Sequence, residues 1–316
     1  MSEDDEFSAA ISEIRLSRRL LFRRAAAAAA LLAGGCTRAA APSASDDPMA
    51  PVPIPAQAPA TEEFATLPDA RLWYWDTGGD GDPIVLLHPN SGSALTWPYQ
   101  QPVFSGAGYR VVAYSRRGHY NSSPVVPENP GSGSTDLHRL ADLLGLGSFH
   151  LVASAGGCSH ALDFALSSPE RLLSMVLAGG RGGVQDAEYQ TLTDALLPPG
   201  FEEMPPEFRE LGPSYRAANA EGMKQWLEQN RMAVTGTREG QQAVNQVTWA
   251  KLSGLRIPVL LLTGDADLYI PPSLLRRFAA IIPGSEMIVI PDAGHATYWE
   301  QPARFNRAVL DFVARH

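Results

Sequence analysis

The chain has 316 residues, of which 45% are hydrophobic and 19% charged, and its formal net charge is −9 at pH 7. Its contents of 28 Gly, 26 Pro and 2 Cys exclude a collagenous chain, a disordered chain and a disulfide scaffold. The acidic balance argues against a nucleic-acid partner, because binding to a phosphate backbone needs clustered basic residues.

The N-terminal segment has the pattern of an export signal. Arginine pairs at 18–19 and 23–24 precede an Ala-rich apolar run over 25–33, and Cys36 follows two glycines. The run has about half of the ~20 apolar residues that a membrane span needs. The arginine pairs resemble a twin-arginine export signal. We therefore expect residues 1–36 to direct the protein to the periplasm or out of the cell.

Cys36 leaves two alternatives for the mature N-terminus. Its position after small residues resembles the lipidated cysteine of a bacterial lipoprotein, which would anchor the protein to a membrane. Cleavage by an ordinary signal peptidase within 39–41 would instead release a soluble enzyme. Either way Cys158 is left alone, so no intramolecular disulfide is expected. The composition of residues 37–61, mostly Ala, Pro, Ser and Asp, predicts a flexible linker.

From residue 62 onward, short apolar runs typical of buried strands alternate with helical patterns. The runs lie at 70–75, 83–87, 109–114, 149–153, 172–177, 259–263 and 287–290. Helical patterns lie at 136–146, 159–166, 219–232 and 304–313. This order predicts an α/β fold with a mostly parallel, doubly wound sheet. The stretch 181–254 has Pro-rich turns and helices but no buried-strand run, so it predicts a helical cap between two parts of the core, 62–180 and 255–316.

Residues 150–157 read His-Leu-Val-Ala-Ser-Ala-Gly-Gly, a strand that runs into a tight turn before a helix. A serine at such a turn is held in a strained conformation that lifts its hydroxyl above the sheet, so Ser154 is the candidate nucleophile. Two other groups follow the later strands. Asp267 lies in the loop after 259–263, where Asp265 is expected only to solvate the turn, and His295 lies after the last strand.

This order of Ser, Asp and His resembles the α/β-hydrolase fold superfamily. The resemblance implies an α/β-hydrolase fold with a helical cap inserted after the sixth strand, and a triad of Ser154, Asp267 and His295. A serine hydroxyl is a weak nucleophile, so His295 would remove its proton while Asp267 orients the imidazole. The backbone N–H groups of Asn90 and Ala155 would form the oxyanion hole.

The sequence departs from the family pattern in three places. Val152 stands at the first glycine of G-x-S-x-G, and Pro89 stands where relatives have the Gly of His-Gly. Ser115 replaces the Asp of an Asp-x-x-Gly-His element, whose final His119 is expected to buttress the loop. The first two departures concern the loops on which the nucleophile and the oxyanion hole depend.

The resemblance implies an exported serine hydrolase that cleaves a carboxylic ester or lactone of a medium-sized hydrophobic substrate through an acyl-enzyme. No phosphate-binding or metal-binding spacing occurs, so no cofactor or metal is expected. Carbon–carbon hydrolysis of a diketone, cofactor-free perhydrolysis and a non-catalytic small-molecule-binding role remain alternatives. The candidate substrate-binding residues are Ser91, Trp97, Tyr120, Leu268, Tyr298 and Trp226, with further aromatic or apolar candidates at Phe201, Phe208, Tyr215 and Ile270. Nothing in the sequence predicts the oligomeric state.

Overall fold

The computed structural model describes residues 50–235 and 240–316. The predicted export signal, Cys36 and the first part of the predicted linker lie outside these residues. Within the described ranges, no helix has the length and apolar character needed to cross a membrane.

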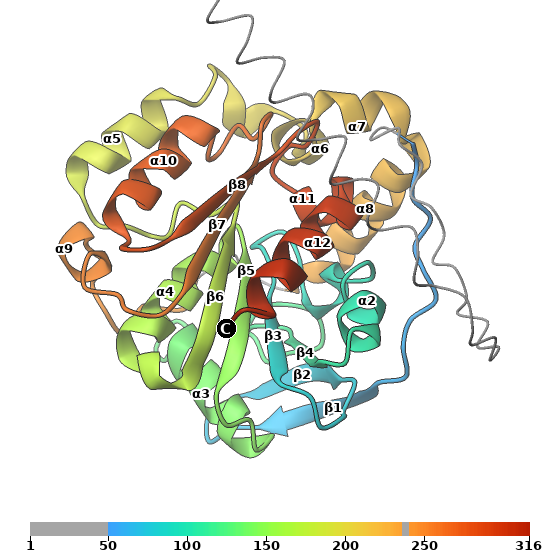
Figure 1. Cartoon of the computed structure of the whole chain (residues 1–316), viewed down its shortest axis with the longest axis vertical. Coiled ribbons are helices and arrows are strands. Elements are labelled where there is room, and N and C mark those ends of the chain that lie inside the picture. The colour runs from blue at the N-terminus through green and yellow to red at the C-terminus, as the bar shows by residue number, and fades with distance from the viewer. Residues whose placement is uncertain (1–49, 236–239) are drawn as a thin grey trace, which may run out of the picture. The chain divides into compact units, whose positions relative to one another are not determined.

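An eight-stranded sheet forms the centre of the fold, in the order β1-β2-β4-β3-β5-β6-β7-β8 (Figure 1). The first two pairings, β1 with β2 and β2 with β4, are antiparallel, and all the others are parallel. The strands are β1 (Thr61–Thr66), β2 (Arg71–Asp76), β3 (Pro83–Leu87), β4 (Arg110–Tyr114), β5 (Phe149–Ser154), β6 (Leu172–Ala178), β7 (Val259–Gly264) and β8 (Glu286–Ile290). The mostly parallel, doubly wound sheet predicted from the sequence is confirmed.

β1 is the strand that the apolar runs did not predict. It lies at the edge of the sheet and exposes most of its side chains, including Glu62 and Glu63. Of its side chains only Ala65 is buried, so β1 has no continuous apolar run and hydrophobic pattern alone does not reveal it.

Helices cover both faces of the sheet, and each face has its own buried cluster. One cluster joins the sheet to α3 (Gly133–Leu143), α4 (Gly157–Ser167) and α10 (Pro272–Ile281). The other joins it to α2 (Gln101–Gly106), α11 (Thr297–Glu300) and α12 (Pro302–Val313). Strand side chains alternate between the clusters, as in β5, where Ala153 belongs to the first and Val152 to the second.

The predicted helices are present, with ends displaced by at most three residues. Those ends are set by local capping that hydrophobic spacing does not encode. Ser132 caps α3 by accepting from Thr135 N, and Asn219 caps α8 (Ala220–Ala233) by accepting from Gly222 N. Short 3₁₀ turns lie at η1 (Ala94–Thr96), η2 (Pro169–Arg171) and η3 (Phe201–Glu203).

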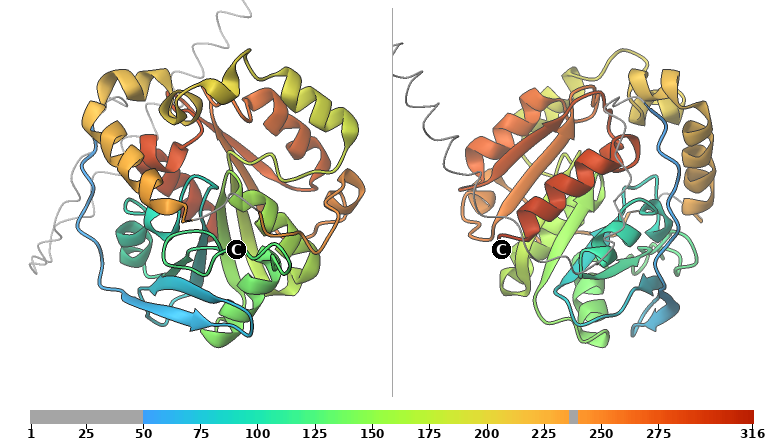
Figure 2. Two further views of the ribbon diagram at one scale, coloured as in Figure 1. Left: turned by 180° about the vertical axis from the view of Figure 1, so that it is seen from behind. Right: turned by 45° about the vertical axis from the view of Figure 1, so that its right-hand side comes forward.

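The insertion between β6 and β7 is helical, as predicted, and it divides between two regions of the core. Its helices are α5 (Ala187–Ala195), α6 (Pro206–Glu210), α7 (Pro213–Ala218), α8 and α9 (Trp249–Leu252). Tyr189 of α5, Trp249 of α9 and Phe278 of α10 pack with ring centroids 5.0 to 5.9 Å apart. The α6–α8 part lies on the other side of β8, near α11 and α12 (Figures 1 and 2). The end of α6 in this second part contacts the candidate site, since Glu210 O accepts from His295 N.

The segment before β1 differs from the flexible linker predicted for 37–61. Ala58 N donates to the Gln101 side chain at 2.8 Å, and the Gln101 amide donates back to Ala58 O at 2.9 Å. The Tyr99 hydroxyl also donates to Val52 O at 2.8 Å. From Val52 onward this Pro-rich segment is therefore docked on the core by hydrogen bonds that its own composition does not reveal.

Candidate active site

Asp267 and His295 form a buried pair beyond the ends of β7 and β8. His295 Nδ1 lies 3.0 Å from Asp267 Oδ1 and 2.9 Å from Oδ2. Asp267 is held by three donors besides, which are Tyr269 N at 2.8 Å, Ile270 N at 3.1 Å and Thr263 Oγ1 at 3.1 Å. Asp265 is exposed, as expected of a residue that only solvates the turn. The pair can therefore orient the imidazole and stabilise its cation.

Two glutamates that sequence reasoning missed hold the loop that carries His295. His295 N donates to the backbone carbonyl of Glu210 at 2.8 Å, so the end of α6 holds the histidine directly. The Glu300 carboxylate accepts from Gly212 N at 2.7 Å and from Gly294 N at 3.0 Å, and it thereby joins the cap to the histidine loop. Burial, with the nearby Asp267 charge, raises the pKa of Glu300 to about 7.

The imidazole has the electrostatic setting of a base. Burial of the ring opposes its charged form, but the charge and hydrogen bond of Asp267, helped by Glu210, outweigh burial and raise the pKa of His295 above its usual 6.5. The Tyr269 ring packs on the imidazole with centroids 4.4 Å apart. A buried imidazole with a carboxylate behind it can take a proton from a group on its other side.

The turn after β5 differs from the one expected. Ser154 is the last residue of the strand and pairs with Ala178 of β6. It is fully buried, and its Oγ has no hydrogen-bond partner among the described residues. The positive φ, +49°, belongs to Ala155. The strain expected at Ser154 is therefore at the next residue, and the role of Ser154 as nucleophile stays a prediction.

The predicted oxyanion donor at Ala155 is wrong, because its N–H donates to Ala178 O at 2.8 Å and is used by the sheet. Gly156, the next residue, lies at the N-terminal end of α4. A Cβ on Gly156 would overlap the Asn90 side chain, so the loop after β3 lies directly against this turn. The structure thus brings Asn90 next to Gly156 rather than next to a free Ala155 N–H.

Arg116 is a buried cation behind Asn90, and sequence reasoning missed it. Its Nη2 donates to Asn90 Oδ1 at 3.0 Å and to His88 O at 3.1 Å, and its Nε has no partner within the part of the chain that the structure describes. Burial lowers its pKa to about 10. His119 Nδ1 lies 2.8 Å from Gly92 O in the same loop, as its expected buttressing role requires. A positive charge behind the Asn90 loop favours negative charge developing in front of it.

Two glycines after β6 lie between the turn after β5 and the Asp267–His295 pair. A Cβ on Gly179 would lie 3.2 Å from His295 Nδ1 and 3.4 Å from Asp267 Oδ2. A Cβ on Gly180 would lie 3.0 Å from the Ala155 carbonyl oxygen. The acid, the base and the turn are therefore neighbours across the end of β6, although they are far apart in sequence.

The predicted substrate-binding residues fall into different environments. The Ser91 hydroxyl donates at 2.8 Å to the carboxylate of Glu210, whose backbone carbonyl holds His295. Leu268, at 37% exposed, and Phe208, at 50%, are open to solvent. Tyr120 is half-buried against Trp73. The remaining candidates are side chains buried in the protein, namely Trp97, Tyr298, Trp226, Tyr215, Phe201 and Ile270.

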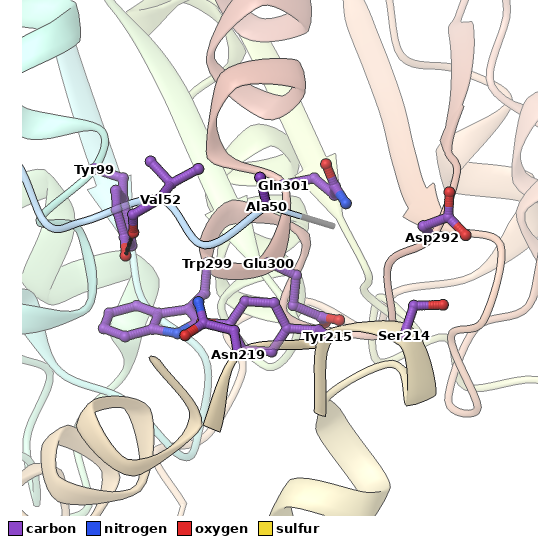
Figure 3. A pocket seen from close by; sticks show the side chains of 10 residues that line it. All are labelled: Ala50, Val52, Tyr99, Ser214, Tyr215, Asn219, Asp292, Trp299, Glu300 and Gln301. Atoms are coloured by element: carbon purple, nitrogen blue, oxygen red, sulfur yellow. Dashed lines mark hydrogen bonds between the residues drawn. The ribbon is translucent and has the colours of Figure 1, made fainter. Parts of the chain in front are cut away.

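A small pocket lies beside this site, and its lining is shown in Figure 3. Tyr215 and Asn219 from the cap, Glu300 and Trp299 from α11, and Val52 from the docked N-terminal segment line it. Of the predicted binding residues, Tyr215 alone is part of this lining. The pocket reaches the site through Glu300, which holds the histidine loop.

The sheet order, the cap and the Asp267–His295 pair define an α/β-hydrolase. Comparison with known proteins agrees, since residues 84–308 match the alpha/beta hydrolase family. The chain belongs to this family of enzymes. It is 30% identical over 265 residues, 78% of this chain and 92% of the relative, to a 2-hydroxy-6-oxononadienedioate/2-hydroxy-6-oxononatrienedioate hydrolase of Burkholderia vietnamiensis.

Solved structures agree with this assignment. A thermophilic esterase from Thermogutta terrifontis with malate bound has a TM-score of 0.65 and 25% identity, over 82% of this chain and 99% of that one. An enol-lactonase from Burkholderia xenovorans has a TM-score of 0.63 over 80% of this chain and 100% of that one, and at 20% identity it shows the fold alone.

Proposed function

We propose that this protein is an exported hydrolase that cleaves a carboxylic ester or lactone of a medium-sized hydrophobic substrate. The observation that carries the proposal is the buried Asp267–His295 pair, with Nδ1 2.9 Å from the carboxylate. A positioned imidazole base beside a loop and a helix N-terminus suited to an oxyanion is what acyl transfer needs. The similarity to an esterase supports the ester as the substrate class.

Hydrolysis of a carbon–carbon bond in a diketone is the second candidate. The 30% identical relative, named as a hydrolase of oxononadienedioates, favours it. The two reactions place the same demands on His295, since both add a nucleophile to a carbonyl and later need a proton on the leaving group. They differ in the leaving group, which is an alkoxide in ester hydrolysis and a carbanion in carbon–carbon hydrolysis.

Export is part of the proposal and rests on the sequence. The arginine pairs and the Ala-rich run precede the described residues, and an enzyme outside the cytoplasm would meet esters and lactones from its surroundings. No cofactor enters the proposed reaction. The partner is a small-molecule substrate, and lipid attachment at Cys36 would be a second, separate association with a membrane.

The test compares a chain-length series of p-nitrophenyl esters with a ring-cleavage-type diketone on the purified protein. Ester turnover that falls by roughly 10² to 10⁴-fold in His295→Gln is the expected result. His138→Gln is the matched control, since that side chain is 41% exposed and lies in α3 away from the site. Diketone turnover without ester turnover would favour the second candidate, and activity unchanged in His295→Gln would contradict both.

A further inference from the structure

The apex of the turn after β5 is the residue with a positive φ, and its side chain faces the substrate. Ala155 has φ +49°, in the left-handed region that few residues other than glycine adopt. In the strand-to-helix turn that lifts a nucleophile above the sheet, the strained residue is the nucleophile itself. The β5–β6 ladder continues through Ser154 to the Ala155 N–H, so the chain leaves the sheet only after Ser154.

The side chain of Ser154 lies within the sheet layer. Strand alternation places it on the same face as Val152, which belongs to the buried cluster with α2 and α12. Its hydroxyl is fully buried and has no partner among the described residues, while His295 uses Nδ1 on Asp267. A nucleophilic serine needs a hydrogen bond to its base, and the side chain of Ser154 makes none.

The glycines around the turn also agree with Ala155, rather than Ser154, at the apex. A Cβ on Gly157 would lie 2.6 Å from Leu87 O and 2.8 Å from His88 O, so glycine is required where α4 crosses β3. With Ala155 as the apex, Gly157 is the last glycine of the G-x-S-x-G pattern and Ala153 replaces the first. The large Val152 then no longer occupies a glycine position. The oxyanion donor after the apex becomes Gly156, which lies against Asn90.

We propose that Ala155 occupies the nucleophile position, so that this enzyme has no serine nucleophile and uses water activated directly by His295. The inference rests on the proposed hydrolase function. His295 Nε2 takes a proton from water, and the oxygen of that water bonds to the substrate carbonyl carbon. The oxyanion is met by the N–H groups of Gly156 and Asn90. The intermediate then breaks its bond to the leaving oxygen, which receives the proton from the imidazolium, so one water gives one acid and one alcohol.

This mechanism makes no acyl-enzyme, because the methyl group of Ala155 cannot attack a carbonyl. It also accounts for an unpartnered hydroxyl at Ser154, which has no part in the reaction. Removing a buried hydroxyl that lacks a partner costs little stability.

The experiment compares labelling by a fluorophosphonate probe with ester turnover in four proteins. Wild type is expected not to be labelled, and Ser154→Ala is expected to keep its fold and to stay within about threefold of wild-type turnover, as a substitution outside the machinery does. Ala155→Ser is expected to gain labelling, because it places a hydroxyl at the apex. Ala155→Ser with His295→Gln is expected to lose that labelling, because the base is gone.

Other results overturn the inference. Labelling of wild type that disappears in Ser154→Ala would identify Ser154 as the nucleophile, and the proposed function would stand while this inference falls. Absence of labelling in an Ala155→Ser protein that melts like wild type would remove Ala155 from the apex. Wild-type ester and diketone turnover that does not respond to His295→Gln would instead contradict the proposed function itself.

Discussion

The protonation state of His295 controls the reaction, because only the neutral imidazole can accept a proton. Burial opposes the charged form, but Asp267 outweighs it and raises the pKa of His295 above 6.5. The active, neutral form is therefore lost as pH falls through a value above 6.5. We expect kcat/KM to rise with pH across a midpoint above that of an ordinary histidine, measured in a buffer series. A midpoint below 6.5 would contradict this electrostatic assignment.

The two aspartates of the loop after β7 should differ in their effects. Asp267 is buried on the imidazole, whereas Asp265 is exposed. Asp267→Asn should lower kcat by roughly 10³ to 10⁴-fold, because the amide favours the wrong tautomer of His295. Asp265→Asn is the matched control and should change kcat little. Steady-state kinetics of both variants check this, and a reversed result would move the acid by two residues.

At the scale of elements, the cap and the histidine loop are packed without space between them. A Cβ on Gly212 would lie 2.8 Å from Gly294 N and 2.9 Å from the Glu300 carboxylate. Gly212→Ala must therefore displace the loop that holds His295, and we expect a lower melting temperature together with a fall in kcat of about tenfold or more.

Gly240→Ala is the control for that substitution, because it lies in the same insertion and its added methyl would meet no atom of the described residues within 4 Å. Circular dichroism melting and kcat measured side by side would separate the two variants. Equal effects would mean that the cap does not position His295.

The sequence predicts strands and helices that bury apolar faces, and it fails where a position is defined by tertiary contact. The runs that became β3, β5 and β7 are buried on both sides, so composition alone reveals them. Asp267 and His295 follow strands at the same edge of the sheet and are found for that reason. The residue with the positive φ in the turn after β5 is not found in this way, because Ser154 and Ala155 are both small and only the backbone distinguishes them.

Glu210, Glu300 and Arg116 could not be predicted for a related reason. The two glutamates lie in segments with no motif, and Arg116 stands at a variable position of the Asp-x-x-Gly-His element. Each of the three acquires its role by burial against a distant part of the chain. A carboxylate that accepts from two backbone N–H groups has no signature in the order of the residues. The role of Glu300 can be recognised only when the fold brings Gly212 and Gly294 together.

At the scale of the whole molecule, lipid attachment at Cys36 is the proposal that would hold the mature protein on a membrane. A lipid chain adds about 0.8 kcal/mol of membrane affinity for each buried CH₂. If Cys36 carries lipid, Cys36→Ala should move the activity from the membrane fraction to the soluble one, with kcat unchanged. Fractionation of the variant identical to that of wild type would rule out the anchor and leave export standing.

The proposed export would depend on the arginine pair at 18–19. The twin-arginine route carries folded proteins, and a chain whose one cysteine in the described residues is the buried, free Cys158 needs no disulfide after crossing. Arg18→Lys with Arg19→Lys keeps both charges but removes the planar guanidinium groups. We therefore expect the double variant to accumulate as precursor in the cytoplasm, with the hydrolase folded and active there, measured by activity and immunoblot of cell fractions. Because the charge is unchanged, a loss of export would show that the arginine pair is recognised as such, whereas export at the wild-type level would contradict the twin-arginine assignment.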